Sequence, residues 1–449
     1  MARFSVGGFQ GRRTSERGSS PAGFWNYVRE SLKVTNDRFV EQRKHRPDRL
    51  IFILILSLLL ISVVVLWSIA PARAAVLGGE NAEFNFIAKQ IGMVALGIVL
   101  FFIASRMPLD FWRRWAGRFL IIAFALSFLL AIFGVMGLPI ASCTNGACRW
   151  YDLPFGLSFQ PAEFLKFGMM LFVAGFLALR IKRGEEGSVL RTVVPVVVMM
   201  LLALFVIVFL ENDLGSGVAL IGIVLCQLVI AKTSWKVIGA LLALVVVIGL
   251  VAVVVAPHRI ERMLSFGADC VVIDPESKDW HICQALTALG SGGFMGRGLG
   301  HSVQAFGWLP EAVNDSIFAI LGETFGFLGV VAILVIFIAL LYRIIKTADY
   351  IDNDFLRIAV AGVFGWIATH VAVNVGAMTG VIPLTGITLP FLSLGGSSLL
   401  FVMVASGIVY NVSRYTSHRK TNDKKGGADE SFGGRRRLGR TRDAGSGGL

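Results

Sequence analysis

The stretch LIFILILSLLLISVVVLWSIA occupies residues 50–70 and contains no charged side chain. A helix of about 20 apolar residues matches the thickness of the hydrocarbon core of a bilayer. The stretch follows a long charged segment and is too long for the apolar core of a secretory signal peptide. We therefore interpret it as an uncleaved first membrane span.

Similar apolar runs recur along the chain and predict ten membrane spans. The chain has 449 residues, of which 55% are hydrophobic and 16% are charged, whereas soluble domains carry about 25% charged residues. A transmembrane β-barrel is excluded because its strands would show short segments of alternating hydrophobicity. We predict an all-α polytopic membrane protein. Its spans lie near residues 50–70, 90–106, 118–138, 160–180, 192–211, 214–231, 236–256, 316–343, 358–382 and 391–412.

The fourth and ninth runs are the least apolar of the ten, so their assignment to lipid-facing helices rests on the weakest signal. Positive charge supports the count of spans. With the N-terminus inside, the inner segments hold 34 Lys and Arg residues and the outer segments hold 7. Because inner loops are enriched in Lys and Arg, both termini are expected in the cytoplasm.

The predicted organisation has three parts. A basic N-terminal tail (1–49) holds 11 Lys/Arg and 5 Asp/Glu, and a basic, disordered C-terminal tail (413–449) holds 10 and 4, a net charge of +6 for each. Between them lies the membrane domain (50–412), with its largest outer segment at about 257–314. Basic tails beside membrane spans favour contact with the anionic inner leaflet. Nucleic-acid binding is the disfavoured alternative.

Four of the five cysteines fall in predicted outer segments. Cys143 and Cys148 share one segment, and Cys270 and Cys283 share another. The outer side of the membrane permits disulfides. We predict two local bridges, with four free thiols as the alternative.

Charged residues near the fourth and sixth spans form two candidate sites. Arg149, at the outer surface, and Lys166 could bind an anion, because phosphates favour Arg forks and Lys point charges. Alternatively, Glu163 and Lys166 form a salt bridge, since residues at i and i+3 share a helical face. Asp213 could cap the sixth helix or hold a divalent cation.

The large outer segment supplies a third candidate site, which consists of cationic residues. Arg259 and Arg262 lie just outside the seventh span, and Arg297 lies in a glycine-rich stretch. They are interpreted either as interfacial anchors or as a pyrophosphate clamp.

The fourth group starts with GWLPEAVNDSI at residues 307–317, where a polar loop meets an apolar helix. It places Asp315 at a membrane surface, with Glu311 four residues earlier. Asp315 is either a helix N-cap, since Asn-Asp-Ser is a typical cap cluster, or a functional carboxylate.

Three further polar residues lie near this stretch, namely Glu323, His370 and Asn374, and the last two are one helical turn apart. The following segment, 383–398, is rich in Pro and Gly. Irregular backbone at membrane depth requires protein or cavity surroundings because lipid cannot satisfy its polar groups. We therefore expect a broken segment beside a groove, a feature that a transporter would also use.

These motifs, in this order, resemble the SEDS (shape, elongation, division, sporulation) family over about residues 50–412. The division-type members are more similar than the elongation-type members. The chain departs from the family pattern at Glu211-Asn212, usually Gln-Pro, at Ser316, usually Phe, and at Ala162, commonly Ser. The matching motifs are QPAE with Lys166 (160–166), DLG (213–215), GLGHSVQ (298–304), LPEAVND (309–315) and PLTGITLPFLSLGGSS (383–398).

The resemblance implies a peptidoglycan glycosyltransferase that polymerises lipid II at the outer face of the membrane during cell division. The family's catalytic Asp corresponds to Asp315, which we expect to act as general base on the acceptor 4-hydroxyl. Undecaprenyl diphosphate would leave, and cationic groups would stabilise its charge. The candidate substrate-binding residues are Arg149, Lys166, Arg259, Arg262, Arg297 and Glu311; Glu163, Asp213, Glu323, His370 and Asn374 are structural or groove-forming candidates.

The resemblance also implies partners. A class B penicillin-binding protein would crosslink the new glycan, and other division proteins would join it at the septum. A divalent cation such as magnesium or manganese is expected only as an assisting ion, because no outer His/Asp cluster supplies a clear ligand set. The rival interpretations are a lipid II flippase, a division scaffold with little activity of its own, and an ion-coupled transporter, for which the sequence shows no internal repeat.

Overall fold

The computed structural model describes residues 43–78, 81–144, 147–154, 157–254, 270, 279–394 and 396–416. Most of both predicted tails lies outside these residues, and so do Arg259 and Arg262.

Ten helices in the described residues overlap the ten predicted spans. Seven of them are long and apolar enough to cross a membrane, and three are shorter apolar helices. The protein is therefore an all-α polytopic membrane protein, as predicted. The ten are α2 (Arg49–Ser68), α4 (Ala82–Arg106), α5 (Leu109–Val135), α6 (Pro161–Lys182), α7 (Val194–Phe205, extended by the π-helical turns η2, Val189–Val193, and η3, Val206–Leu210), α8 (Leu214–Ile230), α9 (Trp235–Val254), α12 (Ile317–Asp349), α13 (Asp354–Met378) and α14 (Gly396–Val412).

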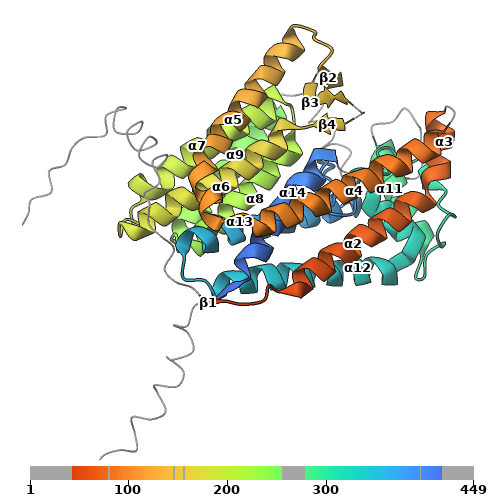
Figure 1. Ribbon diagram of the computed structural model, residues 1–449. Coiled ribbons are helices and arrows are strands. Elements are labelled where there is room, and N and C mark those ends of the chain that lie inside the picture. The colour runs from red at the N-terminus through yellow and green to blue at the C-terminus, as the bar shows by residue number, and fades with distance from the viewer. Residues whose placement is uncertain are drawn as a thin grey trace, which may run out of the picture.

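The first and last described segments meet at one end of the bundle, called here the terminal end (Figure 1). Strand β1 (Arg43–Lys44) pairs with β5 (Tyr415–Thr416) in an antiparallel manner. Close by, Asp48 forms an ion pair of 2.5 Å with Arg343 of α12. The two ends of the membrane domain therefore lie at the same end of the helix bundle.

The opposite end carries elements that the sequence analysis did not predict. A three-stranded antiparallel sheet has the order β2-β3-β4, and Cys143 is joined to Cys148 across β2 and β3. A second disulfide joins Cys270 to Cys283 of α11, so both predicted bridges are present. Except for α11, which has 13 residues, the elements were missed because they are too short to show periodicity. They are α3 (Ala70–Leu77), β2 (Ala141–Thr144), β3 (Ala147–Leu153), β4 (Leu157–Phe159), α11 (Trp280–Gly292) and η4 (Gln304–Phe306).

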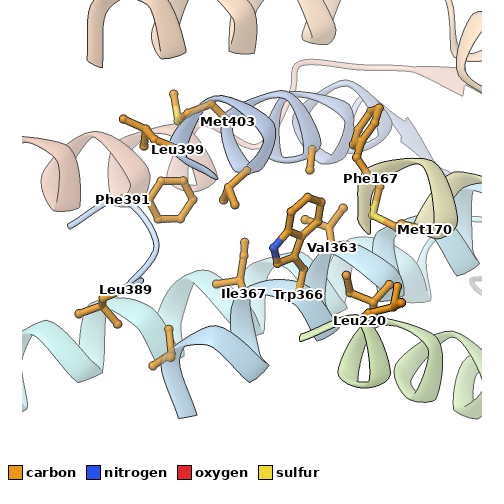
Figure 2. Packing of buried hydrophobic residues seen from close by; sticks show 14 of the residues in the cluster. Phe167, Met170, Leu220, Val363, Trp366, Ile367, Leu389, Phe391, Leu399 and Met403 are labelled. Atoms are coloured by element: carbon orange, nitrogen blue, oxygen red, sulfur yellow. The ribbon is translucent and has the colours of Figure 1, made fainter. Parts of the chain in front are cut away.

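Helices α6 and α13 form the centre of the bundle. They are the least apolar of the seven long helices, and the largest shares of their 18-residue apolar windows are buried inside the protein, 72% and 61%. The two helices contain fewer apolar residues because they face protein more than lipid. Figure 2 shows Trp366 of α13 fully buried among side chains that include Leu220 of α8 and Met403 of α14.

Close backbone contact holds α8 against α13. A Cβ atom at Gly365 would lie 2.7 Å from the carbonyl oxygen of Gly222. Glycine is required here because any side chain would push the two helices apart, and overpacking of this kind costs about 1–3 kcal/mol.

We expect Gly365→Ala to lower the melting temperature of the detergent-solubilised protein by several degrees, measured by intrinsic fluorescence. The control is Gly175→Ala in α6, where an added Cβ meets nothing within 4 Å. That change should be neutral or slightly stabilising, because Ala favours helix more than Gly does. Equal melting temperatures for Gly365→Ala and the native protein would contradict the close contact.

Candidate functional site

Asp315 lies half-buried where a loop enters α12. The N-cap position of α12 belongs to Ser316, not to Asp315, so the cap interpretation of Asp315 is wrong. The Ser316 hydroxyl donates to the Pro310 carbonyl at 2.8 Å and lies 2.7 Å from Nε2 of His281. Since the hydroxyl has one hydrogen, Nε2 of His281 must be the donor in the second bond. Ser316 thus fixes the turn that precedes the helix.

The backbone leading to Asp315 is held by donors from the C-terminal part of the chain. Three consecutive carbonyl groups each accept a hydrogen bond from a different donor. Two of these donors lie at the end of segment 383–394, and the third is a side chain of α13. The pairs are Val313 with the Leu394 backbone N–H (2.8 Å), Asn314 with the Ser393 hydroxyl (2.6 Å) and Asp315 with Nδ2 of Asn374 (2.6 Å).

Segment 383–394 also approaches the Asp315 carboxylate. A Cβ at Gly386 would lie 3.8 Å from Oδ2 of Asp315, and Gly386 has φ of +74°. Glycine suits this position because other residues rarely adopt such a backbone conformation. The exposed Glu311 also has positive φ, +49°, and its Oε2 accepts from Nδ2 of Asn314 at 2.6 Å. Glu311 therefore lies in the loop that carries Asp315.

A buried polar network lies beneath this segment. Lys166 is fully buried, and its Nζ lies 2.9 Å from Oε1 of Glu163 and 3.2 Å from Nε2 of His370. Nε2 also accepts from the Trp366 indole at 3.2 Å, while Nδ1 lies 3.0 Å from the Thr388 carbonyl. His370 is therefore neutral, with its proton on Nδ1. The structure favours the salt-bridge interpretation of Glu163 and Lys166 over an anion site at the surface.

Arg149 anchors the sheet to the turn between η3 and α8. Its guanidinium donates to the Glu211 carbonyl at 3.3 Å and to the Asn212 carbonyl at 2.8 Å. The next residue, Asp213, caps α8 by accepting from the Ser216 N–H at 2.9 Å, and its other oxygen accepts from Gln160 at 2.8 Å. The cap interpretation of Asp213 is thus confirmed.

The turn that Arg149 contacts and segment 383–394 meet at the start of α8. A Cβ at Gly215 would lie 2.7 Å from the Ile387 side chain and 2.8 Å from the Thr385 carbonyl oxygen. Ile387, in turn, is bonded through its carbonyl to Asn374 at 2.7 Å. Residues predicted from three separate motifs are therefore linked by a continuous series of contacts at the end of the bundle opposite the terminal end.

Glu323 and Arg297 organise the neighbouring loop. Glu323 is fully buried, and its carboxylate accepts from the Ser302 hydroxyl at 2.6 Å and the Val303 N–H at 2.9 Å. The Arg297 N–H donates to the Glu323 carbonyl at 2.9 Å, while the Arg297 side chain is exposed. Glu323 thus shapes the loop backbone, and the Arg297 guanidinium remains accessible.

Several contributors were missed by the sequence analysis. Ser393, Gly386 and Gln160 all lie in motifs that match the family, but residue type and spacing alone predicted no contact for any of them. Their roles depend on contacts between segments far apart in the chain, which residue type and spacing do not reveal. Within the described residues, no group of three or more His, Cys, Asp and Glu side chains could hold a metal ion.

Glu211 is buried just beyond η3. Burial raises the pKa of Glu211 to about 8, and the charges of Asp213 and Glu163 act in the same direction. The Ser127 hydroxyl and the Ala162 backbone partly offset the rise. Glu211 is thus largely protonated at neutral pH.

We expect Glu211→Gln to flatten the pH dependence of stability. Between the ordinary pKa of 4.5 and the folded value of about 8, the folded protein binds more protons than the unfolded chain, so native stability falls as pH rises. Across roughly pH 5–9, the melting temperature of the native protein should therefore fall relative to that of the variant as pH rises. Parallel curves for the two proteins would contradict a protonated Glu211.

Comparisons with known proteins agree with this architecture. A family model described as "Cell cycle protein", FtsW/RodA/SpoVE, matches residues 48–418. Stage V sporulation protein E of Bacillus subtilis (strain 168) is 35% identical over 84% of this chain and 99% of that protein. A probable peptidoglycan glycosyltransferase FtsW of Nitrosomonas europaea is 31% identical over 81% of this chain and 92% of that protein.

Solved structures share the fold. A chain from a peptidoglycan synthase complex, whose title refers to coordination of polymerization and crosslinking, aligns with a TM-score of 0.59 and 24% identity, covering 83% of this chain and 99% of that chain. The rod shape determining protein RodA of Thermus thermophilus aligns with a TM-score of 0.53 and 21% identity, covering 83% and 98%. Motifs, fold and relatives agree, and the chain belongs to the FtsW/RodA/SpoVE family of cell cycle proteins, the SEDS family.

Proposed function

We propose that this protein is a peptidoglycan glycosyltransferase that polymerises lipid II into glycan strands during cell division. Relatives named as probable peptidoglycan glycosyltransferases support the activity. The observation that supports Asp315 as the catalytic residue is the hydrogen bonding of its backbone. Donors from two distant segments bind the carbonyl groups of Asn314 and Asp315. A carboxylate held in this manner suits a reaction that requires one positioned base.

In the proposed reaction, Asp315 takes the proton of the acceptor 4-hydroxyl as that oxygen attacks the anomeric carbon of the donor. The bond between the anomeric carbon and the diphosphate oxygen breaks, and undecaprenyl diphosphate leaves with the electron pair. The displacement is a single step and inverts the anomeric carbon. No carboxylate nucleophile is needed.

Cationic side chains would stabilise the leaving diphosphate. Arg149 is the best-supported candidate, because its Nε and one amino group are bound to backbone carbonyls and its other amino group makes no hydrogen bond to the residues that the structure describes. Arg297 contributes an exposed guanidinium, and Arg259 and Arg262 complete the proposed set. Lys166 is proposed to act indirectly, through the network that it forms with His370. Magnesium or manganese has no proposed step.

The proposed site faces the outside of the cytoplasmic membrane, with both termini in the cytoplasm. The distribution of Lys and Arg supports this orientation, and the pairing of β1 with β5 is consistent with two ends on one side. We also propose that a class B penicillin-binding protein crosslinks the product and that other division proteins recruit the pair to the septum. The similarity to a chain of a peptidoglycan synthase complex supports this partner.

We expect Asp315→Asn to lower lipid II polymerisation by about 10²–10⁴-fold, the usual contribution of a general base. Purified protein with its cognate transpeptidase would be assayed for glycan chains on a gel. The native protein and each variant should have equal melting temperatures, so that a loss of activity is not a loss of folding. The control is Asp354→Asn, which removes a carboxylate that pairs with Arg357 at the start of α13 and should leave activity unchanged.

The outcomes separate the competing interpretations. Equal activity of Asp315→Asn and the native protein would remove Asp315 from catalysis and direct attention to Glu311 or Glu323. No product from the native protein, even with its partner, would overturn the enzyme proposal in favour of a flippase or a scaffold.

A further inference from the structure

Asn374 stands out among the polar residues around Asp315 because one of its atoms joins three parts of the chain. Asn374 lies on α13 and is 1% exposed. Its Nδ2 is 2.6 Å from the Asp315 carbonyl oxygen and 2.7 Å from the Ile387 carbonyl oxygen. An amide nitrogen carries two hydrogens, so these two bonds use its whole capacity to donate.

The orientation of the amide is determined by these contacts. If the side chain were flipped, its oxygen would face two carbonyl oxygens at hydrogen-bond distance, which is repulsive. In the observed orientation, Oδ1 is buried without a hydrogen-bond partner in the described part of the chain. The contribution of Asn374 to this structure is therefore donation to Asp315 and Ile387.

Neighbouring contacts make this bridge specific to the site. One turn earlier on α13, His370 contacts the Thr388 carbonyl, which follows that of Ile387. A Cβ at Gly386, which precedes Ile387, would lie 3.8 Å from Oδ2 of Asp315. A shift of Ile387 would therefore disturb both the Asn374 bond to the Asp315 carbonyl and the backbone near the Asp315 carboxylate.

We propose that Asn374 is a positioning residue for the glycosyl transfer: it sets the place of the Asp315 carboxylate by tying its backbone to segment 383–394. Asn374 acts through Asp315 and touches no reacting atom. This inference rests on the proposed function. It predicts that Asn374 affects the rate of the chemical step more than the binding of lipid II, because a misplaced base costs rate without removing a substrate contact.

The chain offers a matched control in Asn411. It is also a buried asparagine, and its Nδ2 donates to the Met107 carbonyl at 2.7 Å. Met107 follows α4 at the end of the bundle that carries the termini. Asn411→Leu therefore removes a comparable buried amide bond away from Asp315.

The test compares kcat and KM for lipid II in Asn374→Leu and Asn411→Leu, with melting temperatures measured for both. We expect Asn374→Leu to lower kcat by about 10²-fold, the scale of a misplaced catalytic group, with little change in KM. Asn411→Leu should keep native kcat even if it loses as much stability. Native kcat in Asn374→Leu, or equal losses in both variants, would overturn the proposal.

A conservative variant adds a second readout. In Asn374→Asp, the carboxyl can donate a hydrogen bond only when protonated. The ratio of its kcat to that of the native protein should therefore rise as pH falls, while the ratio for Asn374→Leu should stay flat. Because Asn374→Leu also keeps Asp315 and introduces no charge, its flat ratio controls for the titration of the base. A flat ratio for Asn374→Asp would overturn the role of donation.

Hydrogen exchange separates this proposal from the proposed function. Peptides covering residues 309–317 and 383–394 should exchange faster in Asn374→Leu than in the native protein or Asn411→Leu. Unchanged exchange overturns the positioning role. An inactive native protein overturns the glycosyltransferase proposal instead, and faster exchange would then still support Asn374 as the residue that holds the Asp315 segment.

Discussion

Backbone that leaves helical geometry at the end of a membrane bundle must satisfy its polar groups within the protein. This constraint governs the segment before α12. Its carbonyl groups at 313, 314 and 315 point to donors that other segments provide. Lipid could not supply such donors. Segment 309–316 is therefore held by donors of segment 383–394 and by Asn374, which also donates to Ile387 in that segment.

The buried network of Lys166, Glu163 and His370 supports the same region from below. A buried lysine is tolerated when an opposite charge and hydrogen-bond acceptors surround it. Here the partners come from α6 and α13, the two most buried helices, and His370 extends the network to the Thr388 carbonyl. The network thus joins the core of the bundle to segment 383–394, whose end is hydrogen-bonded to the backbone before Asp315. A mid-membrane transport site would expose such charges to a pathway, whereas Lys166 is fully enclosed.

The departures from the family pattern acquire a physical meaning in this structure. Ser316 occupies the N-cap position of α12 and bonds to Pro310 and His281, so a residue that differs from the usual Phe still fixes the turn. Glu211 replaces the usual Gln and is buried with a raised pKa. A protonated Glu resembles Gln in shape and in its ability to donate, which explains how the exchange is accommodated at neutral pH.

The sequence by itself determined the membrane class, the ten spans and the membership of the family, because span length, charge bias and local motifs are properties of contiguous residues. It also identified some of the residues gathered near Asp315, among them Glu311 and Asn374, and paired the outer cysteines. The tertiary structure decided between the alternatives that spacing left open. Asp213 caps a helix and Asp315 does not, Lys166 is enclosed in a salt bridge, and Asn374 bridges two segments. The surroundings that decide these roles come from segments far apart in the chain, whose distances are set by helix packing rather than by local pattern. The small sheet and α11 were also left to tertiary structure, because disulfides and cross-strand bonds that join separate residues of the outer segments stabilise them.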